Sequence, residues 1–297
     1  MSVVCFGEVL WDMLPGGKVA GGAPMNVAFH ARNLGLDASL VSRVGRDALG
    51  EELLGFLHEK GIPTTFVQRD AQHPTSTVEV QLDKAGHASY EIVAPVAWGF
   101  IELEEQAVSA ARQSKAMVFG SLAARSATSR RTLLSLLEQA PMKVFDVNLR
   151  PPHYSRPLLE TLLAKADLVK MNEEELATVS RWYGDENQEA AQMELLLKQF
   201  SLAGVLLTKG GDGAAFLGER TSYTTQPAYT VQVKDTVGSG DSFLAAFLSK
   251  FLTGQPVSEA LQFAAATGAL VATHDGGTPE LAEGDVEAFI LKTKFIS

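Results

Sequence analysis

The chain has 297 residues and a formal net charge of −10 at pH 7, from 25 Lys and Arg against 35 Asp and Glu. This acidic balance argues against a nucleic-acid or anionic-membrane partner, because both favour a basic protein face. Hydrophobic residues make up 46 % of the chain and charged residues 20 %, which permits a full core and excludes a disordered chain. Cys5 is the single cysteine, so an internal disulfide framework and a cysteine-rich zinc site are excluded.

The N-terminal residues lack the basic start and the long apolar core of a signal peptide. No apolar run approaches the roughly 18 residues needed to span a bilayer. We therefore expect a cytoplasmic protein without a membrane role. Since no linker, internal repeat or low-complexity segment interrupts the chain, we expect one domain over residues 1–297.

Short runs rich in β-branched and aromatic residues alternate with longer segments of helical period, which predicts an α/β fold with a mainly parallel sheet. A first strand is expected over residues 3–10, followed by a helix that begins near Asn26 and ends at Gly35. A strand at residues 38–44 and a helix at 49–60 come next. Further buried strands are expected at residues 116–119, 143–147, 168–171 and 205–208.

One stretch departs from this alternation. Residues 77–82 alternate polar and apolar side chains with period two, residues 83–86 supply a turn, and residues 87–92 return. This pattern predicts an antiparallel hairpin with one polar face, which has to pack outside the parallel sheet. The hairpin is either a surface decoration or a lid or dimer surface.

The strongest local signal is the turn Asp235-Thr-Val-Gly-Ser-Gly-Asp241, between an expected strand at residues 229–233 and an apolar helix. A small-residue turn that enters a helix exposes unpaired N–H groups at the positive end of the helix dipole, and these groups bind anions. Gly238, Ser239 and Gly240 would form the site. Asp241, in the first helical turn, can accept a proton from a substrate hydroxyl. The alternative is that Asp241 only caps the helix and that the glycines only allow the turn.

Other catalytic templates are absent from the sequence. It contains no G-x-x-x-x-G-K-[ST] phosphate loop, no H-E-x-x-H zinc motif and no G-x-S-x-G nucleophile elbow. Its six histidines show no metal-ligand spacing. These absences leave the turn before Asp241 as the principal candidate site.

The segment Gly21-Gly-Ala-Pro-Met-Asn-Val-Ala-Phe-His-Ala-Arg-Asn-Leu-Gly35 resembles the N-terminal signature of the ribokinase-like carbohydrate kinases, the phosphofructokinase B family. Residues 235–243 resemble the C-terminal signature of that family. Landmarks at residues 45–50, 146–150, 172–175 and 208–213 agree in order and spacing, so the resemblance spans the whole chain. Within the family, Gly-Gly-Ala-Pro and the segments at residues 7–12 and 95–98 look most like bacterial fructokinases.

The resemblance implies a three-layer α/β/α sandwich with a small β lid over the sugar site, formed by elements at about residues 11–22 and 75–100. It implies that Asp241 deprotonates the acceptor hydroxyl. It also implies that the amides of Gly238, Ser239 and Gly240 stabilise charge on the transferring γ-phosphoryl group, which suits a reaction governed by positioning and electrostatics.

For the acceptor sugar, the resemblance implies contacts from Asp12, Gly22 and Asn26, whose side chains and backbone suit a polyol. Arg150 follows a family motif at a strand end and would meet phosphate bidentately. Simpler interpretations stay open at this point. Asn26 could be only a helix N-cap, Asp12 a loop carboxylate and Gly22 a turn residue, and Arg150 could pair with Asp146.

For the nucleotide, the resemblance implies a site built from Asn172, Thr208, Gly210 and Gly213, at the ends of strands where α/β proteins place ligands. It associates Glu175 with Mg²⁺, through water; the alternative is that residues 172–175 only start a helix. It also implies a monovalent cation, K⁺, although residues 273–277 depart from the family pattern. The residues that match the cation site are Asp235 and Val237, the latter through its carbonyl, with main-chain groups near Ala272, Asp275 and Gly277.

The sequence therefore predicts an ATP-dependent, Mg²⁺-requiring kinase of a small free sugar, with D-fructose the leading acceptor. Ribose, 2-keto-3-deoxygluconate and nucleosides stay open as acceptors within the same fold. The alternative from another class is a non-catalytic sugar or nucleotide sensor. The intact Gly238-Ser-Gly-Asp241 argues against a sensor, and dimerisation through the lid stays open.

Overall fold

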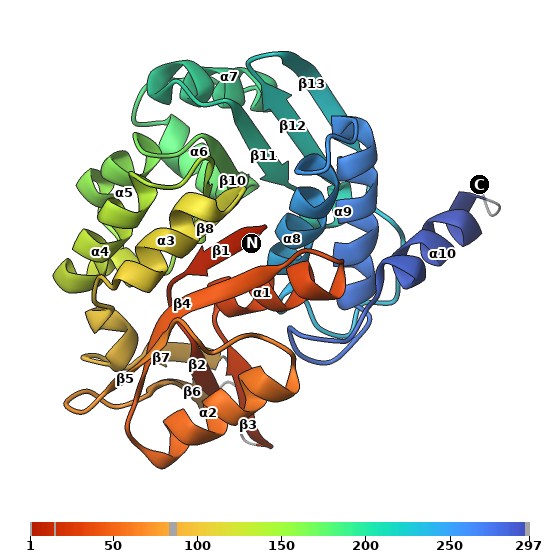
Figure 1. The fold of residues 1–297 in the computed structure, drawn as a ribbon. Coiled ribbons are helices and arrows are strands. Elements are labelled where there is room, and N and C mark those ends of the chain that lie inside the picture. The colour runs from red at the N-terminus through yellow and green to blue at the C-terminus, as the bar shows by residue number, and fades with distance from the viewer. Residues whose placement is uncertain (1, 15, 83–87, 295–297) are drawn as a thin grey trace.

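The computed structural model describes residues 2–14, 16–82 and 88–294, and its centre is a nine-stranded sheet (Figure 1). The strands lie in the order β13 (Thr221–Gln226), β12 (Ala214–Gly218), β11 (Gly204–Thr208), β10 (Leu168–Asn172), β9 (Lys143–Asp146), β8 (Ala116–Gly120), β1 (Val3–Phe6), β4 (Ala38–Gly45) and β5 (Val67–Asp70). From β11 to β5 all neighbours are parallel, while β12 and β13 are antiparallel additions at one edge. The predicted mainly parallel sheet is confirmed.

Helices cover both faces of this sheet (Figure 1). One core cluster joins the sheet to α1 (Ala23–Asn33), α2 (Ala48–Glu59), α8 (Ser239–Phe251), α9 (Val257–Val271) and α10 (Glu283–Lys294). The other joins it to α3 (Glu105–Gln113), α4 (Ala127–Leu137), α5 (Arg156–Leu163), α6 (Glu173–Ser180) and α7 (Glu189–Phe200). The implied three-layer sandwich is therefore confirmed.

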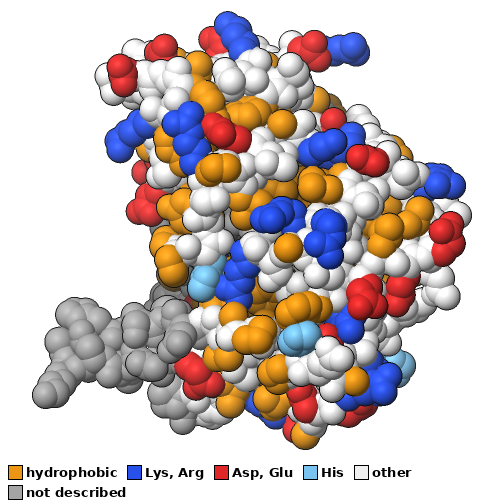
Figure 2. Space-filling view, turned by 90° about the vertical axis from the view of Figure 1, so that its left-hand side faces the viewer, with side chains coloured by type: hydrophobic (Ala, Val, Ile, Leu, Met, Phe, Trp, Pro, Cys, Tyr) orange, Lys and Arg blue, Asp and Glu red, His pale blue; other side chains and the backbone are white. Residues whose placement is uncertain are grey.

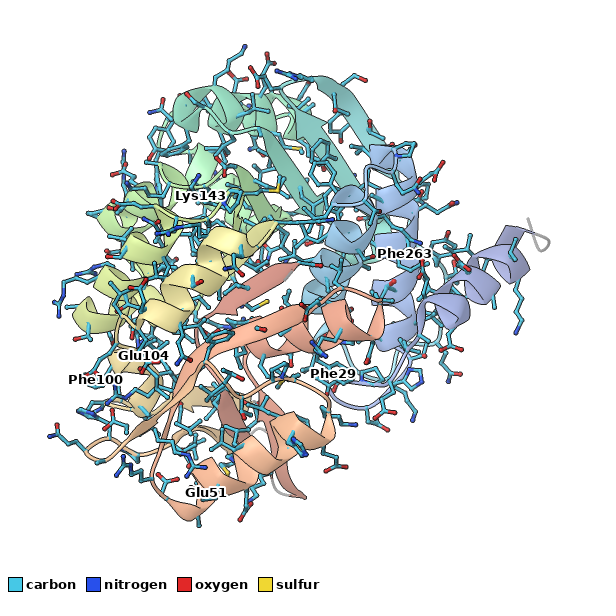
Figure 3. The ribbon with its side chains drawn as sticks, in the orientation of Figure 1. Phe29, Glu51, Phe100, Glu104, Lys143 and Phe263 are labelled. Atoms are coloured by element: carbon cyan, nitrogen blue, oxygen red, sulfur yellow. The ribbon has the colours of Figure 1, made fainter. Side chains whose placement is uncertain are left out.

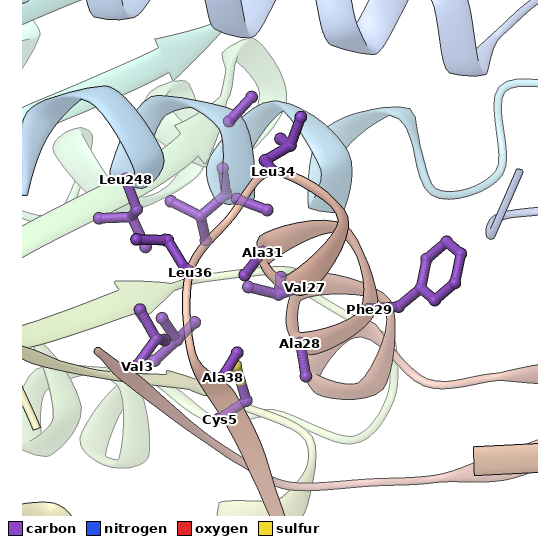
Figure 4. Close-up of a cluster of buried hydrophobic side chains, with 14 of the residues drawn as sticks. Val3, Cys5, Val27, Ala28, Phe29, Ala31, Leu34, Leu36, Ala38 and Leu248 are labelled. Carbon is purple, nitrogen blue, oxygen red and sulfur yellow. The ribbon is translucent and has the colours of Figure 1, made fainter. Parts of the chain in front are cut away.

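The central strand β1 shows why its sequence is apolar throughout. Val3 and Cys5 point into the cluster that contains α1, whereas Val4 and Phe6 point into the opposite cluster. A strand that is buried on both faces has no polar side to alternate with. Figure 4 shows Val3 and Cys5 beside the apolar residues of α1, and Figure 3 labels Phe29 and Phe263, which belong to the same cluster.

A second sheet of four strands lies apart from the first, in the order β3 (Gly17–Gly21), β2 (Leu10–Leu14), β6 (Ser76–Leu82) and β7 (Ala88–Ile92). The pairs β2–β3 and β6–β7 are antiparallel, and β2–β6 is parallel. The predicted hairpin is confirmed as β6 and β7. Its predicted turn at residues 83–86 lies outside the described residues.

Two expected strands are wrong. The run at residues 3–10 is divided into β1 and β2, because at Gly7 the backbone turns to φ 148° and the chain passes from the large sheet to the small one. Residues 229–233 form no strand, although their side chains alternate. They lie in an irregular segment between β13 and α8 that borders the cavity described below.

Acidic and basic side chains are interspersed over the face of the molecule that Figure 2 displays. Among the described residues, no helix has the length and apolar character needed to cross a membrane.

Candidate active site

The predicted anion site forms at the N-terminus of α8. Gly238 adopts φ 74° there, and a Cβ on it would lie 2.5 Å from the carbonyl oxygen of Gly277, so only glycine fits. Within the described part of the chain, the amides of Gly238 and Gly240 have no hydrogen-bond partner. The amide of Ser239 donates to Thr236 (3.2 Å), whereas its hydroxyl is buried without a partner. The turn thus offers two free amides and one hydroxyl to an anion, rather than the three amides that were expected.

Asp241 lies in the first turn of the same helix, where the Nδ2 of Asn26 donates to its Oδ2 at 2.8 Å. Burial, together with the nearby Asp146 carboxylate, raises the pKa of Asp241 to about 6. The charge of Lys170 and the hydrogen bond from Asn26 act in the opposite direction. A carboxylate with such a pKa is ionised at neutral pH and is basic enough to accept a proton.

Asn26 reaches Asp241 from the second turn of α1. The residue that caps this helix is Gly22, with Pro24 following in the first turn, so the interpretation of Asn26 as only an N-cap is wrong. Its Oδ1 is buried and has no partner among the described residues. The two signature segments of the sequence therefore meet at one hydrogen bond.

A buried ion pair lies behind the anion site. Nζ of Lys170 is 3.0 Å from Oδ1 of Asp146, and both side chains are buried. A Cβ on Gly240 would lie 3.1 Å from the same ammonium, so the positive charge packs directly against the turn. Burial alone would lower the pKa of Lys170, but the Asp146 and Asp241 carboxylates outweigh it and the pKa is raised. This site therefore holds a fixed positive charge.

Sequence reasoning missed Lys170, although a lysine in the apolar run of β10 was a usable signal. The alternative pairing of Arg150 with Asp146 is wrong, because Asp146 pairs with Lys170. Within the described residues Arg150 is exposed and its side chain has no ion-pair or hydrogen-bond partner. Its guanidinium is thus free to meet a ligand.

Beside the anion site lies a cavity of about 600 Å³. Its lining brings together the four predicted nucleotide residues, Asn172, Thr208, Gly210 and Gly213, with Ser239 and Gly240 from the anion site. Apolar and small side chains complete it, among them the residues that were not predicted: Tyr229, Val231, Val233, Phe243, Ala265, Gly268 and Ala269. The small residues at the i, i+3 and i+4 positions of α9 were the signal that could have indicated this wall. A cavity lined by both polar and apolar residues suits a nucleotide.

On the acceptor side, Asp12 lies in β2 and is half-buried. Burial raises the pKa of its carboxyl group, and the charge of Arg150 opposes that rise. The positive charge of Arg150 also acts to lower the pKa of Asp241 and of Glu8, so these carboxyl groups lie close to Arg150. The predicted acceptor residues are therefore brought to one place by the fold.

The family model described as pfkB family carbohydrate kinase matches residues 7–283. The chain belongs to this family. It is an ATP-dependent sugar kinase with the ribokinase-like fold.

A fructokinase from Klebsiella pneumoniae is 32% identical to this kinase over 260 residues, which is 82% of each chain. The crystal structure of a fructokinase from Xylella fastidiosa with bound ATP has a TM-score of 0.87, at 26% identity, and covers 99% of both chains. A fructokinase double mutant from Vibrio cholerae O395, with fructose, ADP and potassium ion bound, has a TM-score of 0.83 at 25% identity and covers 98% of both chains.

Glu175 of this kinase is held by the start of α6. It forms a capping box with Asn172, and its second carboxylate oxygen accepts the amide of Leu149 at 2.8 Å. No group of three or more His, Cys, Asp or Glu within the described residues could hold a metal by itself. Mg²⁺ usually binds through one or two carboxylates, water and substrate phosphates. Glu175 is buried, both of its carboxylate oxygens accept backbone amides, and it is not among the residues that line the cavity. The helix-start interpretation of residues 172–175 therefore holds, and the role of Glu175 toward Mg²⁺ stays a prediction.

The residues of the expected K⁺ site fit only in part. Asp235 is oriented by the amides of Val237 and Gly276, which it accepts at 3.0 and 3.1 Å. The carbonyl of Ala272 already accepts two amides, and the carbonyl of Gly277 lies 2.8 Å from Nε2 of His30. Asp235 and the carbonyl of Val237 remain suitable cation ligands, while Ala272 does not fit.

His30 contacts the loop that contains Gly277, which the sequence did not predict. Its Nε2 lies 2.8 Å from the carbonyl oxygen of Gly277, and burial lowers the pKa of the imidazole to about 4, so the ring is neutral. A neutral imidazole donates one hydrogen bond to that carbonyl. His30 lies one helical turn after Asn26, so α1 holds both Asp241 and the loop that packs on Gly238.

Proposed function

We propose that this kinase phosphorylates D-fructose with ATP and that Asp241 is its general base. The observation that carries the proposal is the 2.8 Å hydrogen bond from Asn26 to Asp241, which fixes a basic carboxylate beside the anion site at the N-terminus of α8. Fructose as the acceptor is supported by two similar proteins that are fructokinases, one of them with fructose bound in its crystal structure.

In the proposed reaction, a hydroxyl of the sugar lies against the Asp241 carboxylate. The hydroxyl proton passes to Asp241, the hydroxyl oxygen forms a bond to the γ-phosphorus, and the bond from that phosphorus to the oxygen of ADP breaks. The free amides of Gly238 and Gly240 stabilise the charge that develops on the transferring group. Lys170 adds positive charge behind them.

The remaining residues position the two substrates. Thr208, Gly210 and Gly213 hold the nucleotide in the cavity of about 600 Å³, with the apolar lining residues around the base. Asp12, Gly22 and Asn26 orient the sugar, and Arg150 meets phosphate. When bound, Mg²⁺ supplies neutralisation of phosphate charge, and Glu175 is the residue that would hold it through water.

We further propose that the four-stranded sheet of β2, β3, β6 and β7 is a lid that closes over the sugar. Its location apart from the main sheet and the presence of Asp12 on β2 support this role. A lid excludes water, which would otherwise accept the phosphoryl group.

The test is an assay of ADP release from ATP and Mg²⁺ with D-fructose, ribose, 2-keto-3-deoxygluconate and a nucleoside as acceptors. D-Fructose should give the highest kcat/KM, and the Asp241→Asn variant should give almost no turnover. A different best acceptor would keep the kinase assignment and overturn fructose. No turnover with any acceptor, together with sugar binding by calorimetry, would indicate a sensor.

A further inference from the structure

Three buried polar atoms without a partner gather at the end of β1. Within the described residues, Oε2 of Glu8, Nε1 of Trp98 and Nη1 of Arg125 are all shielded from solvent and have no hydrogen-bond partner. Glu8 is 3 % exposed and Trp98 is fully buried. Because an unpaired buried polar group is costly, such a set indicates a place that a polar ligand or water fills.

Backbone packing brings these residues together from distant parts of the chain. A Cβ on Gly7, next to Glu8, would lie 3.6 Å from the Cβ of Ala123, the first residue of the short helix η2 (Ala123–Arg125). The guanidinium of Arg125, at the end of η2, lies over the Trp98 ring at 4.7 Å from its centroid. Three loops therefore meet at one point.

This point adjoins the acceptor side of the active site. A Cβ on Gly22, the residue that caps α1, would lie 2.5 Å from the carbonyl oxygen of Glu8. The same helix carries Asn26, which holds Asp241. The charge of Glu8 acts to raise the pKa of Arg125, and the charge of Asp241 acts to raise the pKa of Glu8. The three unpaired atoms thus lie within electrostatic reach of the proposed base.

Their chemistry is complementary to a neutral polyol. A carboxylate accepts hydrogen bonds from hydroxyl groups, whereas the indole N–H and the guanidinium donate to hydroxyl oxygens. Burial raises the pKa of Glu8 to about 7, so its carboxyl group accepts a hydrogen bond when ionised and donates one when protonated, and a sugar hydroxyl group can satisfy it in either form. The stacked Trp98 ring holds the guanidinium plane in place.

We propose that Glu8, Trp98 and Arg125 bind the acceptor sugar at hydroxyl groups other than the one that reacts, and so determine which sugar is accepted. This inference rests on the proposed function, since it takes the sugar to lie against Asp241. It adds to the acceptor site Glu8, which follows β1, Trp98 of η1 (Ala97–Phe100) and Arg125 of η2.

The first test compares Glu8→Gln, Arg125→Gln and Trp98→Phe with the wild type. The KM for the best sugar should rise by about 10- to 100-fold in the first two variants and by about 3- to 10-fold in Trp98→Phe, while the KM for ATP stays within about twofold. The matched control is Arg131→Gln, because Arg131 is exposed on α4 and its guanidinium donates to Thr128 of the same helix (3.5 Å), away from η2. It should change neither KM by more than about twofold.

The second test uses deoxysugars that each lack one hydroxyl group of the best acceptor. Removal of a contacted hydroxyl should lower kcat/KM by about tenfold or more in the wild type and by less than about twofold in the variant that lost its partner. Equal losses in wild type and variants, or a sugar KM within twofold in all variants that fold, would overturn the inference and assign these atoms to buried water. If Glu8→Gln does not fold, Arg125→Gln and Trp98→Phe decide. A wild type that phosphorylates no sugar would instead refute the proposed function.

Discussion

Replacement of Asp241 by asparagine should lower the activity of this kinase and raise its stability. Asn keeps the size of the side chain and can still accept the hydrogen bond from Asn26, but it cannot take a proton. We therefore expect kcat to fall by about 10²- to 10⁴-fold, with little change in sugar affinity. The folded protein should at the same time become more stable at neutral pH.

The gain in stability follows from the raised pKa of Asp241. The pKa is 3.8 in the unfolded chain and about 6 in the fold, chiefly because burial penalises the charged form. Ionised Asp241 thus costs free energy in the folded state, and this cost is fully present above pH 6 and disappears below pH 3.8. At about 1.4 kcal/mol per pKa unit, the variant should gain up to about 3 kcal/mol at pH 7.5, but only about 1 kcal/mol at pH 4.5.

Urea unfolding of wild type and variant at the two pH values measures this difference, and ADP release measures kcat. Glu259→Gln is the control, because Glu259 is an exposed carboxylate in the first turn of a neighbouring helix. It should shift the free energy of unfolding by less than about 0.5 kcal/mol at both pH values. A variant that loses stability at pH 7.5 would refute the electrostatic argument, and one that keeps near-normal kcat would remove Asp241 from the mechanism.

Three further outcomes are expected. The kcat/KM of the wild type should rise with pH through about 6 and then level off, since Asp241 accepts a proton only when ionised; a flat profile from pH 5 to 8 would contradict its role. Amides of β6 and β7 should exchange more slowly at saturating sugar, measured by hydrogen exchange, if the small sheet closes; unchanged exchange would make it a static element. Free fructose should exceed fructose 6-phosphate by at least about tenfold in kcat/KM, because the Asp12 and Asp241 carboxyl groups near Arg150 repel a second phosphate and Glu8 opposes the charge of Arg125. If the kinetics of the two acceptors, measured side by side, show an equal or reversed preference, a cationic group must bind the second phosphate and this prediction is wrong.

The structure divides the strand expected at residues 3–10 into two, which shows that a local sequence pattern does not determine where a strand ends. Eight residues with few breaks predict one strand, and the sequence contains no sign of where the chain changes sheets. The change occurs at Gly7, where packing against Pro24 (2.7 Å from an added Cβ) permits only glycine. The alternating residues 229–233 fail for a related reason: they find no partner strand and instead border the nucleotide cavity. A pattern can show which residues are able to form a strand, but pairing depends on what lies beside them.

The sequence by itself determined the alternation of strands and helices, the turn before α8 and the family, because periodicity, turn chemistry and motif order are local properties of the chain. It also predicted Asn26 and Asp241 as site residues. Only the tertiary structure decided that these two side chains, 215 positions apart, share a hydrogen bond, and that Lys170 lies beneath Gly240. The same holds for the unpaired atoms of Glu8 and Arg125, because burial and charge coupling arise from elements that meet only when the chain is folded.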